Sequence, residues 1–527
     1  MILERDLQTL AAAKDAWARL SVERKIGMLE RVKRLTHATA HEWVALAAQA
    51  KGLRPDSQPI GEEWISGPWA LLYALNRYLR TLRGISARGE APLPPARLRD
   101  GGRTVLRVFP RTVYDRLLLG GISAEVWMRP GVTPAQVPAE ACSLYRTAQP
   151  RGRVVLVLGA GNIASIAPLD VLYKMLAEGA VCMLKMHPVN AYLGPVLERI
   201  FAEFVADGFL RFAYGGAGVG AQLAAHALVE EIHVTGSKAT HDAIFASVGS
   251  TKRITSELGN VSPTIVLPGP WSDNDVAFQA ENIATQKAHN AGFNCVAAQV
   301  LILPKAWKHA AALRDRVSAI LRTLNCPQYY PGAAARLGAL VGADAKPGAM
   351  VDVDPQDFDH PLVTTEAFCG VLACVELPGE LDSYVRDAVA FANDKLAGTL
   401  GANLIVHPRT SKTHARVVEQ AVTDLRYGCV AVNGWTGIGY FLTETPWGAY
   451  PGHTPDNAGS GIGVVHNAYF LERTEKTVIY APFSPFPRPP WFVTNAMQAQ
   501  IGRALCDFEA APSPARAAHV AALALRG

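Results

Sequence analysis

Short apolar runs alternate with helix-forming segments from residue 153 onward. Val154–Leu158 is a continuous apolar run, Ser165–Glu178 has helical spacing of its apolar residues, and Val181–Leu184 is a second apolar run. Continuous apolar strands are typical of parallel sheets that are buried on both faces, and parallel strands need a crossover connection, usually a helix. The sequence therefore predicts an α/β fold with a nucleotide-binding type of sheet.

A second alternating series follows the first. It runs from Thr264–Leu267 through the helical pattern of Asp275–Lys287 to Val300–Leu303, and later to Ala402–Val406. At 527 residues the chain is longer than one hydrophobic core normally supports. We therefore expect two Rossmann-like α/β domains and additional elements.

Composition excludes several classes of function. The formal net charge is +5, and there is neither a Lys/Arg run nor zinc-like Cys/His spacing, so no nucleic acid or metal is expected. The eight cysteines form no Cys-x-x-Cys pair, which favours free thiols in a reducing compartment. The longest apolar stretches are interrupted by Asp170, Lys174 and Glu178, so we expect no membrane span and a cytoplasmic protein.

Cys295 lies in the segment Asn290–Gln299, where a glycine-containing loop leads into an apolar strand. A thiol at a loop-to-strand junction is reachable by a substrate carbonyl. Free cysteine is also among the most commonly buried residues, so a core thiol is the alternative.

Two loops have the patterns of cofactor sites. Gly159-Ala-Gly161-Asn-Ile-Ala164 follows a strand with the spacing of a dinucleotide fingerprint, but Lys185-Met-His187 stands where an acidic residue would meet the ribose. This is either a Rossmann site that prefers a 2′-phosphate or a loop with another purpose. Thr235-Gly-Ser237 precedes a helix, so Ser237 is either a plain N-cap or part of a pyrophosphate site.

Glu257 ends the strand-like run Arg253–Ser256, where the first alternating series gives way to the second. A carboxylate at this junction could act as a general base on water. The alternative is a solvated surface glutamate.

The order of these motifs resembles the aldehyde dehydrogenase superfamily from about residue 150 to 480. That family has an asparagine after a buried strand and a lysine 23 residues later, then Thr-Gly-Ser, Glu-Leu-Gly-x-x-Ser-Pro, a Gly-x-x-Cys loop, Glu-x-Phe-Gly-Pro-Val and Val-Asn. The matching positions here are Asn162, Lys185, Thr235–Ser237, Glu257–Pro263, Gly292–Cys295, Glu366–Val371 and Val432–Asn433.

The resemblance implies a role for each matching residue. Cys295 would be the nucleophile, Asn162 with the Cys295 backbone N–H would form the oxyanion hole, and Glu257 would activate the hydrolytic water. The residues implied to bind the cofactor are Lys185 and Glu366 at the riboses, Gly236 and Ser237 at the pyrophosphate, and Phe368 near the nicotinamide ribose.

Three departures from the family pattern stand out. Gly-Ala-Gly161-Asn162-Ile-Ala replaces Pro-Trp-Asn-Phe-Pro, and Phe368-Cys-Gly-Val replaces Phe-Gly-Pro-Val. His187-Pro188 stands where many members have Ser-Glu, whose carboxylate favours NAD by repelling a 2′-phosphate. Both NAD and NADP therefore stay open as cofactors.

The resemblance also implies a domain plan. Residues 1–119 and 150–258 would form the cofactor domain, and 259–460 the catalytic domain. Residues 120–149 and 470–490 would form a β element that bridges subunits of a homodimer or homotetramer. Residues 491–527 form a tail that could cover a subunit interface, cap the substrate tunnel or be a surface helix, and we expect the last.

The hypothesis is NAD(P)-dependent oxidation of an aldehyde to a carboxylic acid through a cysteine thiohemiacetal and thioester. The substrate aldehyde is not specified by the sequence. Three rivals remain: an acylating enzyme that uses coenzyme A, a Rossmann oxidoreductase that uses Gly159–Ala164, and a non-catalytic nucleotide-binding descendant.

Overall fold

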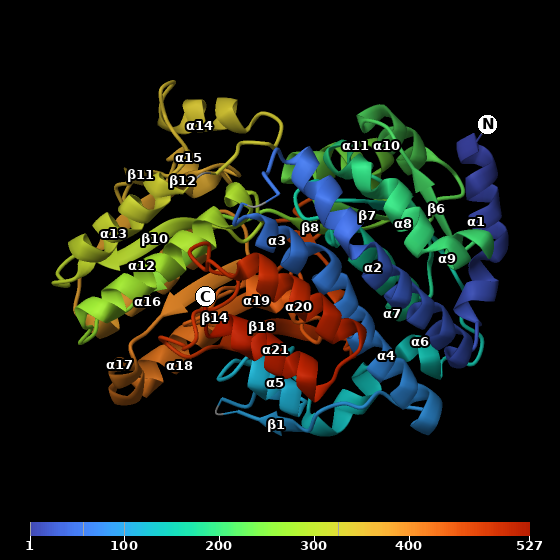
Figure 1. The fold of residues 1–527 in the computed structure, drawn as a ribbon, viewed down its shortest axis with the longest axis horizontal. Coiled ribbons are helices and arrows are strands. Elements are labelled where there is room, and N and C mark those ends of the chain that lie inside the picture. Colours follow the sequence, from blue (N-terminus) through green and yellow to red (C-terminus); the bar gives the residue numbers. More distant parts are fainter. Residues whose placement is uncertain (1, 56, 100, 325) are drawn as a thin grey trace.

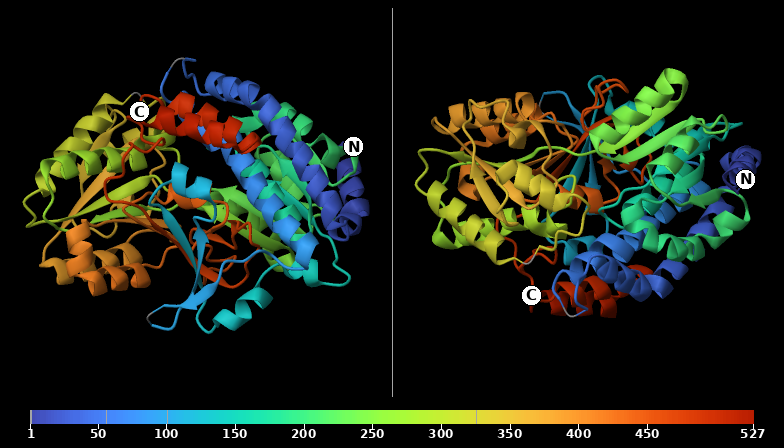
Figure 2. Two further views of the ribbon diagram at one scale, coloured as in Figure 1. Left: turned by 60° about the horizontal axis from the view of Figure 1, so that its bottom comes forward. Right: turned by 90° about the horizontal axis from the view of Figure 1, so that it is seen from above.

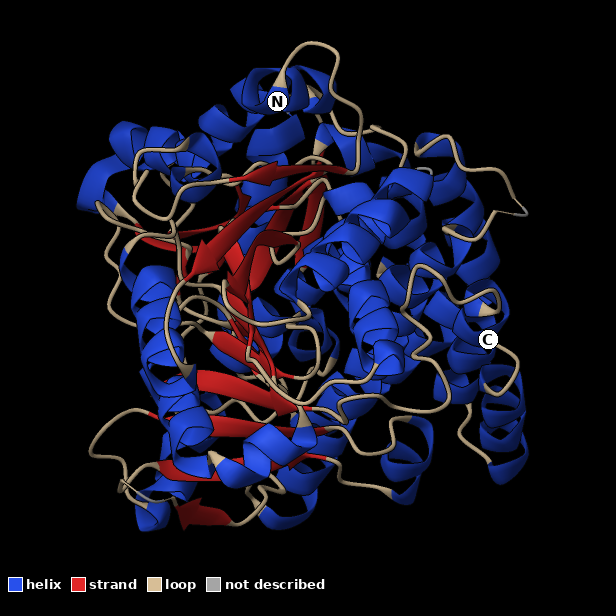
Figure 3. Ribbon diagram, turned by 90° about the vertical axis from the view of Figure 1, so that its left-hand side faces the viewer, coloured by secondary structure: helices blue, strands red, loops and turns tan. Residues whose placement is uncertain are grey.

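Two large sheets run through the molecule and are enclosed by helices (Figures 1 and 3), and two further short strands, β15 (Pro446–Trp447) and β17 (Val465–His466), pair with each other. The computed structural model describes residues 2–55, 57–99, 101–324 and 326–527. Both sheets are built mainly from the apolar runs that alternate with helices in the sequence. The predicted α/β fold class is confirmed.

The smaller sheet has six strands in the order β16-β8-β7-β4-β5-β6. Its parallel strands are β4 (Val154–Leu158), β5 (Val181–Lys185), β6 (Leu210–Ala213), β7 (Glu231–Gly236) and β8 (Arg253–Leu258). The short β16 (Gly461–Ile462) adds antiparallel to β8. The order reverses between β4 and β7, and ligands of open α/β sheets bind at such a switch point.

Helices pack on this sheet because its strands are buried and apolar. α1 (Ile2–Ala18) and α7 (Ile166–Glu178) contact β4 and β5, whereas α10 (Ala217–Ala225) contacts β4 and α11 (Lys238–Val248) contacts β7 and β8. Gly179, at φ +67°, ends α7 in a left-handed conformation that glycine adopts without strain.

The larger sheet has ten strands in the order β1-β2-β3-β18-β14-β13-β9-β10-β12-β11. Its parallel part comprises β9 (Ser262–Val266), β10 (Ala298–Pro304), β11 (Ala349–Asp352), β12 (Val371–Leu377), β13 (Gly401–Ile405) and β14 (Cys429–Val432). The helices α12 (Asp273–Ala288), α13 (Ala310–Thr323) and α16 (Leu381–Asp394) contact it. This part corresponds to the second alternating series.

The strands expected to bridge subunits extend the larger sheet within the same chain. They are β3 (Ser123–Met128) and β18 (Thr474–Tyr480). The strands β1 (Ala96–Leu98) and β2 (Thr104–Phe109), which were expected in the cofactor domain, continue the same sheet. β18 pairs parallel with β14 and antiparallel with β3, and β3 pairs with β2. The predicted domain boundary after residue 119 therefore separates β2 from β3, although these two strands pair. Burial of the predicted bridging element does not require a second subunit. A homodimer or homotetramer stays a prediction.

The C-terminal tail packs against the N-terminal helices (Figure 2). α20 (Gln498–Ala510) contacts α3 (Ile60–Trp64) and the adjoining η1 (Ile65–Trp69), and it also contacts α2 (Val22–Ala50) and α4 (Ala70–Arg88). α20 buries Ile501, Cys506 and Phe508, whereas α21 (Pro514–Ala524) is mostly exposed. The expectation of a plain surface helix is therefore wrong for α20, because its apolar face completes a core with segments far away in sequence.

The remaining helices and short strands connect these parts. They are α5 (Val113–Leu118), η2 (Pro134–Glu140), α6 (Ser143–Arg146), η3 (Pro188–Leu193), α8 (Gly194–Ile200), α9 (Ala202–Ala206), η4 (Gly249–Thr251), η5 (His289–Gly292), α14 (Ala333–Val341), α15 (Pro361–Thr364), α17 (Pro408–Thr413), α18 (Ala415–Asp424), α19 (Gly437–Phe441), β15 (Pro446–Trp447) and β17 (Val465–His466). All eight cysteines lie within the described residues and are free thiols. No helix of the described ranges is both long enough and apolar enough to cross a bilayer.

Candidate active site

One cavity of about 800 Å³ lies where the strand ends of the smaller sheet face the cysteine loop of the larger sheet. It brings together every site residue predicted from the sequence. These lining residues are Asn162, Lys185, Gly236, Ser237, Glu257, Cys295, Glu366 and Phe368. Asn162 and Cys295, which are 133 residues apart in the sequence, thus line the same cavity.

Cys295 is presented by a strained turn. α12 ends at Ala288, and Asn290 and Ala291 then have φ of +53° and +55° before the chain enters β10 at Ala298. Cys295 is half-buried and lines the cavity. Burial raises the pKa of its thiol, and the negative charges of Glu366 and Glu257 raise it further. The resting residue is therefore a thiol, and thiolate must be generated for reaction.

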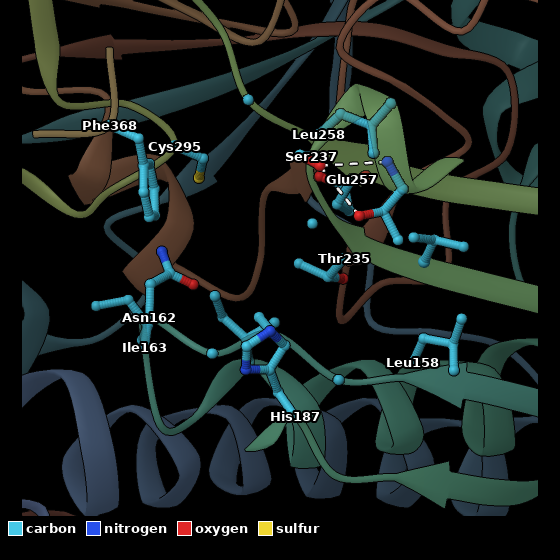
Figure 4. Close-up of a pocket in the computed structure, with 18 of the residues that line it drawn as sticks. Leu158, Asn162, Ile163, His187, Thr235, Ser237, Glu257, Leu258, Cys295 and Phe368 are labelled. Atoms are coloured by element: carbon cyan, nitrogen blue, oxygen red, sulfur yellow. Dashed lines mark hydrogen bonds between the residues drawn. The ribbon is translucent and has the colours of Figure 1, made fainter. Parts of the chain in front are cut away.

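Asn162 is held by the cysteine loop itself. Its Nδ2 donates to the Phe293 carbonyl oxygen at 2.9 Å, and Phe293 stands two residues before Cys295. Figure 4 shows the Asn162 amide nitrogen turned toward Cys295 and Phe368. A side-chain amide has two N–H donors, so one fixes the side chain and the second remains for a group bound beside Cys295.

Glu257 is a buried carboxyl group, not a surface residue. It lies in β8 and is only 6% exposed. Neither of its carboxyl oxygens has a hydrogen-bond partner among the described residues. Burial holds its pKa well above the usual range; nearby Asp170 raises it further, and Lys174 acts in the opposite direction. The solvated-glutamate alternative is therefore wrong, because the side chain is buried and its Oε1 lies 3.0 Å from the position that a Cβ on Gly448 would occupy.

The other end of the cavity is more open. Ser237 caps α11 by accepting a hydrogen bond from the Thr240 backbone N–H at 3.2 Å (Figure 4). Both Gly236 and Ser237 are exposed, and no atom lies within 4 Å of the position that a Cβ on Gly236 would occupy. The helix N-terminus therefore faces the cavity with free backbone donors, a suitable environment for an anion.

Two charged residues line the same region. Lys185 ends β5, is buried, and has its pKa lowered by desolvation. Glu366 lies against Gly259, where an added Cβ would stand 1.7 Å from its Oε2. Burial raises the pKa of Glu366 to about 8, although the positive charge of Lys287 opposes this shift. Glu366 Oε1 has no hydrogen-bond partner among the described residues, so it is available to a bound hydroxyl group.

Phe368 belongs to an aromatic cluster beside the cysteine loop. It has φ of +42°, and its ring lies 5.0 Å from Tyr330 and 5.6 Å from Phe293, measured between ring centroids. These contacts hold its ring at the cavity wall. Cys369 and Gly370, which replace the family's Gly-Pro, are both buried.

The glycine-rich loop packs closely against the end of β5. A Cβ on Gly161 would stand 2.3 Å from His187 Nδ1. The Gly159 N–H donates to the Lys185 carbonyl oxygen at 3.1 Å. The glycines therefore allow this loop to approach the histidine and turn Asn162 toward the cysteine loop.

Several residues around the site have no recognisable signal in the sequence. Tyr330, Arg336 and Tyr440 also line the cavity. Lys51 contacts the cysteine loop although it is 239 residues from Asn290. A lone lysine or tyrosine has no characteristic spacing, so only the tertiary structure could find these residues.

Comparison of the fold and the sequence with known proteins shows what the chain is similar to. The aldehyde dehydrogenase family model matches residues 130–346. A gamma-glutamyl-gamma-aminobutyraldehyde dehydrogenase from Burkholderia cenocepacia has the same fold, with a TM-score of 0.62, 19% identity, and coverage of 90% of this chain and 87% of that one. An indole-3-acetaldehyde dehydrogenase in complex with NAD+ gives a TM-score of 0.63, 17% identity and coverage of 91% and 88%.

Two curated relatives match in sequence. Aldehyde dehydrogenase LUC3 of a Fusarium species is 32% identical over 158 residues, which are 30% of this chain and 32% of that protein. A coniferyl aldehyde dehydrogenase of a Pseudomonas species is 28% identical over 238 residues, 44% of this chain and 48% of that protein. The chain thus spans about a third to a half of the length of these relatives. Together, the family model, the relatives and the fold indicate the aldehyde dehydrogenase superfamily.

Proposed function

We propose that this protein oxidises an aldehyde to a carboxylic acid with NAD or NADP, using Cys295 as the nucleophile. The observation that carries the proposal is the shared cavity of Cys295, the Asn162 amide and the buried Glu257 carboxyl group. The names of the curated relatives and of the solved neighbours, which are aldehyde dehydrogenases, support the same chemistry.

The cofactor end of the cavity fits a nicotinamide dinucleotide. Gly236, Ser237 and the N-terminus of α11 would hold the pyrophosphate, and Lys185 and Glu366 would bind ribose hydroxyl groups. Phe368 would pack near the nicotinamide ribose. The bound group would supply the hydride acceptor. No carboxylate follows Lys185 within the segment His187-Pro188, so a 2′-phosphate meets no like charge there.

The residues of this chain would carry the reaction in two stages. The Cys295 thiolate adds to the aldehyde carbon, and the resulting oxyanion accepts hydrogen bonds from Asn162 Nδ2 and the Cys295 backbone N–H. Loss of hydride from this thiohemiacetal leaves a thioester on Cys295. Glu257 then removes a proton from water as it attacks the thioester, which releases the acid and the thiol.

The buried carboxyl group also bears on the rivals. An acylating enzyme that uses coenzyme A needs no base for water, so Glu257 would have no role in it. A Rossmann oxidoreductase would place Gly159–Ala164 around a phosphate and would leave the hydrogen bond from Asn162 to the cysteine loop without a purpose. A non-catalytic descendant would not need Cys295 at the cavity wall.

Mass spectrometry of the modified protein tests the proposal. Wild-type protein mixed with an aldehyde and NAD or NADP should give a burst of reduced cofactor and a transient acyl group on Cys295, and Cys295→Ala should give neither. An acyl group on another cysteine, or undiminished turnover in Cys295→Ala, would refute it. Adding coenzyme A tests the acylating rival, because only that enzyme would form an acyl-CoA product.

A further inference from the structure

A buried charged cluster lies behind the loops that carry Asn162 and Cys295. Lys51 caps the C-terminus of α2, and Glu62 and Glu63 belong to α3. All three side chains are buried, and Lys51 Nζ donates to Glu63 Oε1 at 2.6 Å. None of these residues lines the cavity described above. The reaction proposed above does not use them.

Asn290 connects this cluster to the two loops. Its Oδ1 accepts hydrogen bonds from Lys51 Nζ at 2.9 Å and from the Tyr329 hydroxyl at 2.9 Å. Its Nδ2 donates at 3.1 Å to the carbonyl oxygens of Asn162 and of Phe293. Its backbone N–H donates to Glu62 Oε2 at 2.6 Å. A single side chain therefore bridges the N-terminal segment, the Asn162 loop and the cysteine loop.

The charge of Lys51 fixes the direction of these hydrogen bonds. An ammonium group can only donate, so the Asn290 amide must present its oxygen to Lys51 and its NH2 group to the two carbonyls. The Phe293 carbonyl can only accept, so Asn162 must present its own NH2 group to Phe293 and thus to the cavity side. With the opposite orientation, Asn162 would offer an oxygen to the developing oxyanion, which would be repulsive.

We propose that Lys51 is a positioning residue for the oxyanion donor, and that it acts through Asn290. This inference rests on the proposed roles of Cys295 and Asn162. A buried ion pair is weak evidence for stability, because desolvation of the charges offsets their attraction. Lys51 and Glu63 instead hold one orientation of the Asn290 amide, and with it the relative position of the two loops.

Two reactions of Cys295 in the protein without cofactor test the inference. With p-nitrophenyl acetate, the thiolate adds to the ester carbonyl, an oxyanion forms, and p-nitrophenolate leaves as the thioester forms. With iodoacetamide, the same thiolate displaces iodide from carbon and no oxyanion forms. In both reactions the thiol proton goes to water. The ratio of the acylation rate to the alkylation rate therefore measures the contribution of the oxyanion donor. Changes in the exposure or the thiolate content of Cys295 affect both rates and cancel in this ratio.

The variants remove the bridge at two points. Asn290→Gly keeps the left-handed backbone, which has φ of +53°, and deletes the side chain. The double variant Lys51→Met with Glu63→Gln removes the buried ion pair and keeps Glu62, whose Oε2 still accepts the Asn290 backbone N–H. Lys25→Met is the matched control, because Lys25 is equally buried in α2 but lies over the rings of Trp17 and Tyr145.

Asn290→Gly should lower the acylation rate about 100-fold, the typical effect of a misplaced or missing oxyanion donor, while alkylation changes less than about twofold. The double variant should lower acylation by about tenfold, since Tyr329 still holds Asn290. Lys25→Met should leave both rates unchanged. An unchanged ratio of rates in Asn290→Gly and the double variant would overturn the inference alone. Wild-type Cys295 that is alkylated but never acylated would overturn the proposed function as well.

Discussion

The two ends of the cavity are built from different kinds of groups. At the reaction end, Asn162 and Glu257 are 7% and 6% exposed, and the Glu257 oxygens have no hydrogen-bond partner among the described residues. At the cofactor end, Gly236 and Ser237 are exposed, and Ser237 already has a partner in the Thr240 N–H. The reaction end holds these groups at a cost in folding free energy, whereas the part of the cofactor end at Gly236 and Ser237 uses an ordinary helix cap.

This difference shows where the structure is specialised for chemistry. An unpaired buried carboxylate is unfavourable, so its pKa rises and the group is poised to take up a proton. An open helix N-terminus binds an anion without any such cost. Changes at the reaction end should therefore alter the rate of a chemical step, and changes at the cofactor end should alter affinity.

The largest effect is expected from Glu257→Gln. Steady-state turnover should fall about 100-fold or more, since general bases typically contribute that much, while the burst of reduced cofactor remains. The wild-type deacylation rate should rise with pH, because a base with a raised pKa is deprotonated only at higher pH. Stopped-flow measurement of the burst and of the steady state across pH would check both expectations. Undiminished turnover in the variant would contradict the hydrolytic assignment.

Glu257→Gln should also change how stability depends on pH. The folded-state pKa lies above the unfolded value, so the contribution of Glu257 is fully present below the unfolded pKa and is lost as pH rises through the folded pKa. The variant should therefore gain thermal stability relative to wild type at alkaline pH. Equal melting temperatures of the two proteins at high pH would contradict the burial of this carboxyl group.

A smaller effect is expected from Gly259→Ala, which acts on the cofactor end. The new Cβ would overlap Glu366 Oε2 and displace its carboxylate. Cofactor affinity should fall about tenfold, since a hydrogen bond to a charged group contributes about 1.5–3 kcal/mol, while the burst rate at saturation stays the same. In wild type, affinity should increase as pH rises through about 8, where Glu366 ionises. Titration calorimetry measures both effects.

Gly218→Ala is the control for this substitution, because no atom lies within 4 Å of the Cβ position at Gly218. It should leave cofactor affinity and its pH dependence unchanged. Equal loss of affinity in both variants would mean that Glu366 does not bind the cofactor.

The smallest effect is expected from Pro188→Glu. Pro188 is exposed at the start of η3 and lines the cavity, so a carboxylate there would repel a 2′-phosphate. The ratio of the KM values for NADP and NAD should rise about fivefold, as expected for about 1 kcal/mol between exposed charges. Val189→Glu adds the same charge at a neighbour outside the cavity lining and should change the ratio less. An equal change in the ratio of KM values in the two variants would show that Pro188 does not lie at the cofactor site.

Local patterns in the sequence were enough to predict the strands, whereas the candidate site was predicted from the order of motifs that resembles the aldehyde dehydrogenase superfamily. Val154–Leu158 is a strand with the expected bounds, because an apolar run between turn residues is a local signal. The resemblance implied that Asn162, Glu257 and Cys295 act on the same substrate. Asn162, Glu257 and Cys295 do line one cavity.

Other features depended on contacts between distant segments. Pairing of β18 with β14 inside one chain, burial of α20 and the bridge from Lys51 to Asn290 join residues that no local pattern connects. Periodicity shows which face of a segment is apolar but not which other segment covers it. The sequence by itself determined the α/β plan and the candidate nucleophile, base and oxyanion donor. Only the tertiary structure decided how Asn162 is oriented, since its amide donates to the Phe293 carbonyl oxygen, which Asn290 connects to a buried lysine far away in the chain.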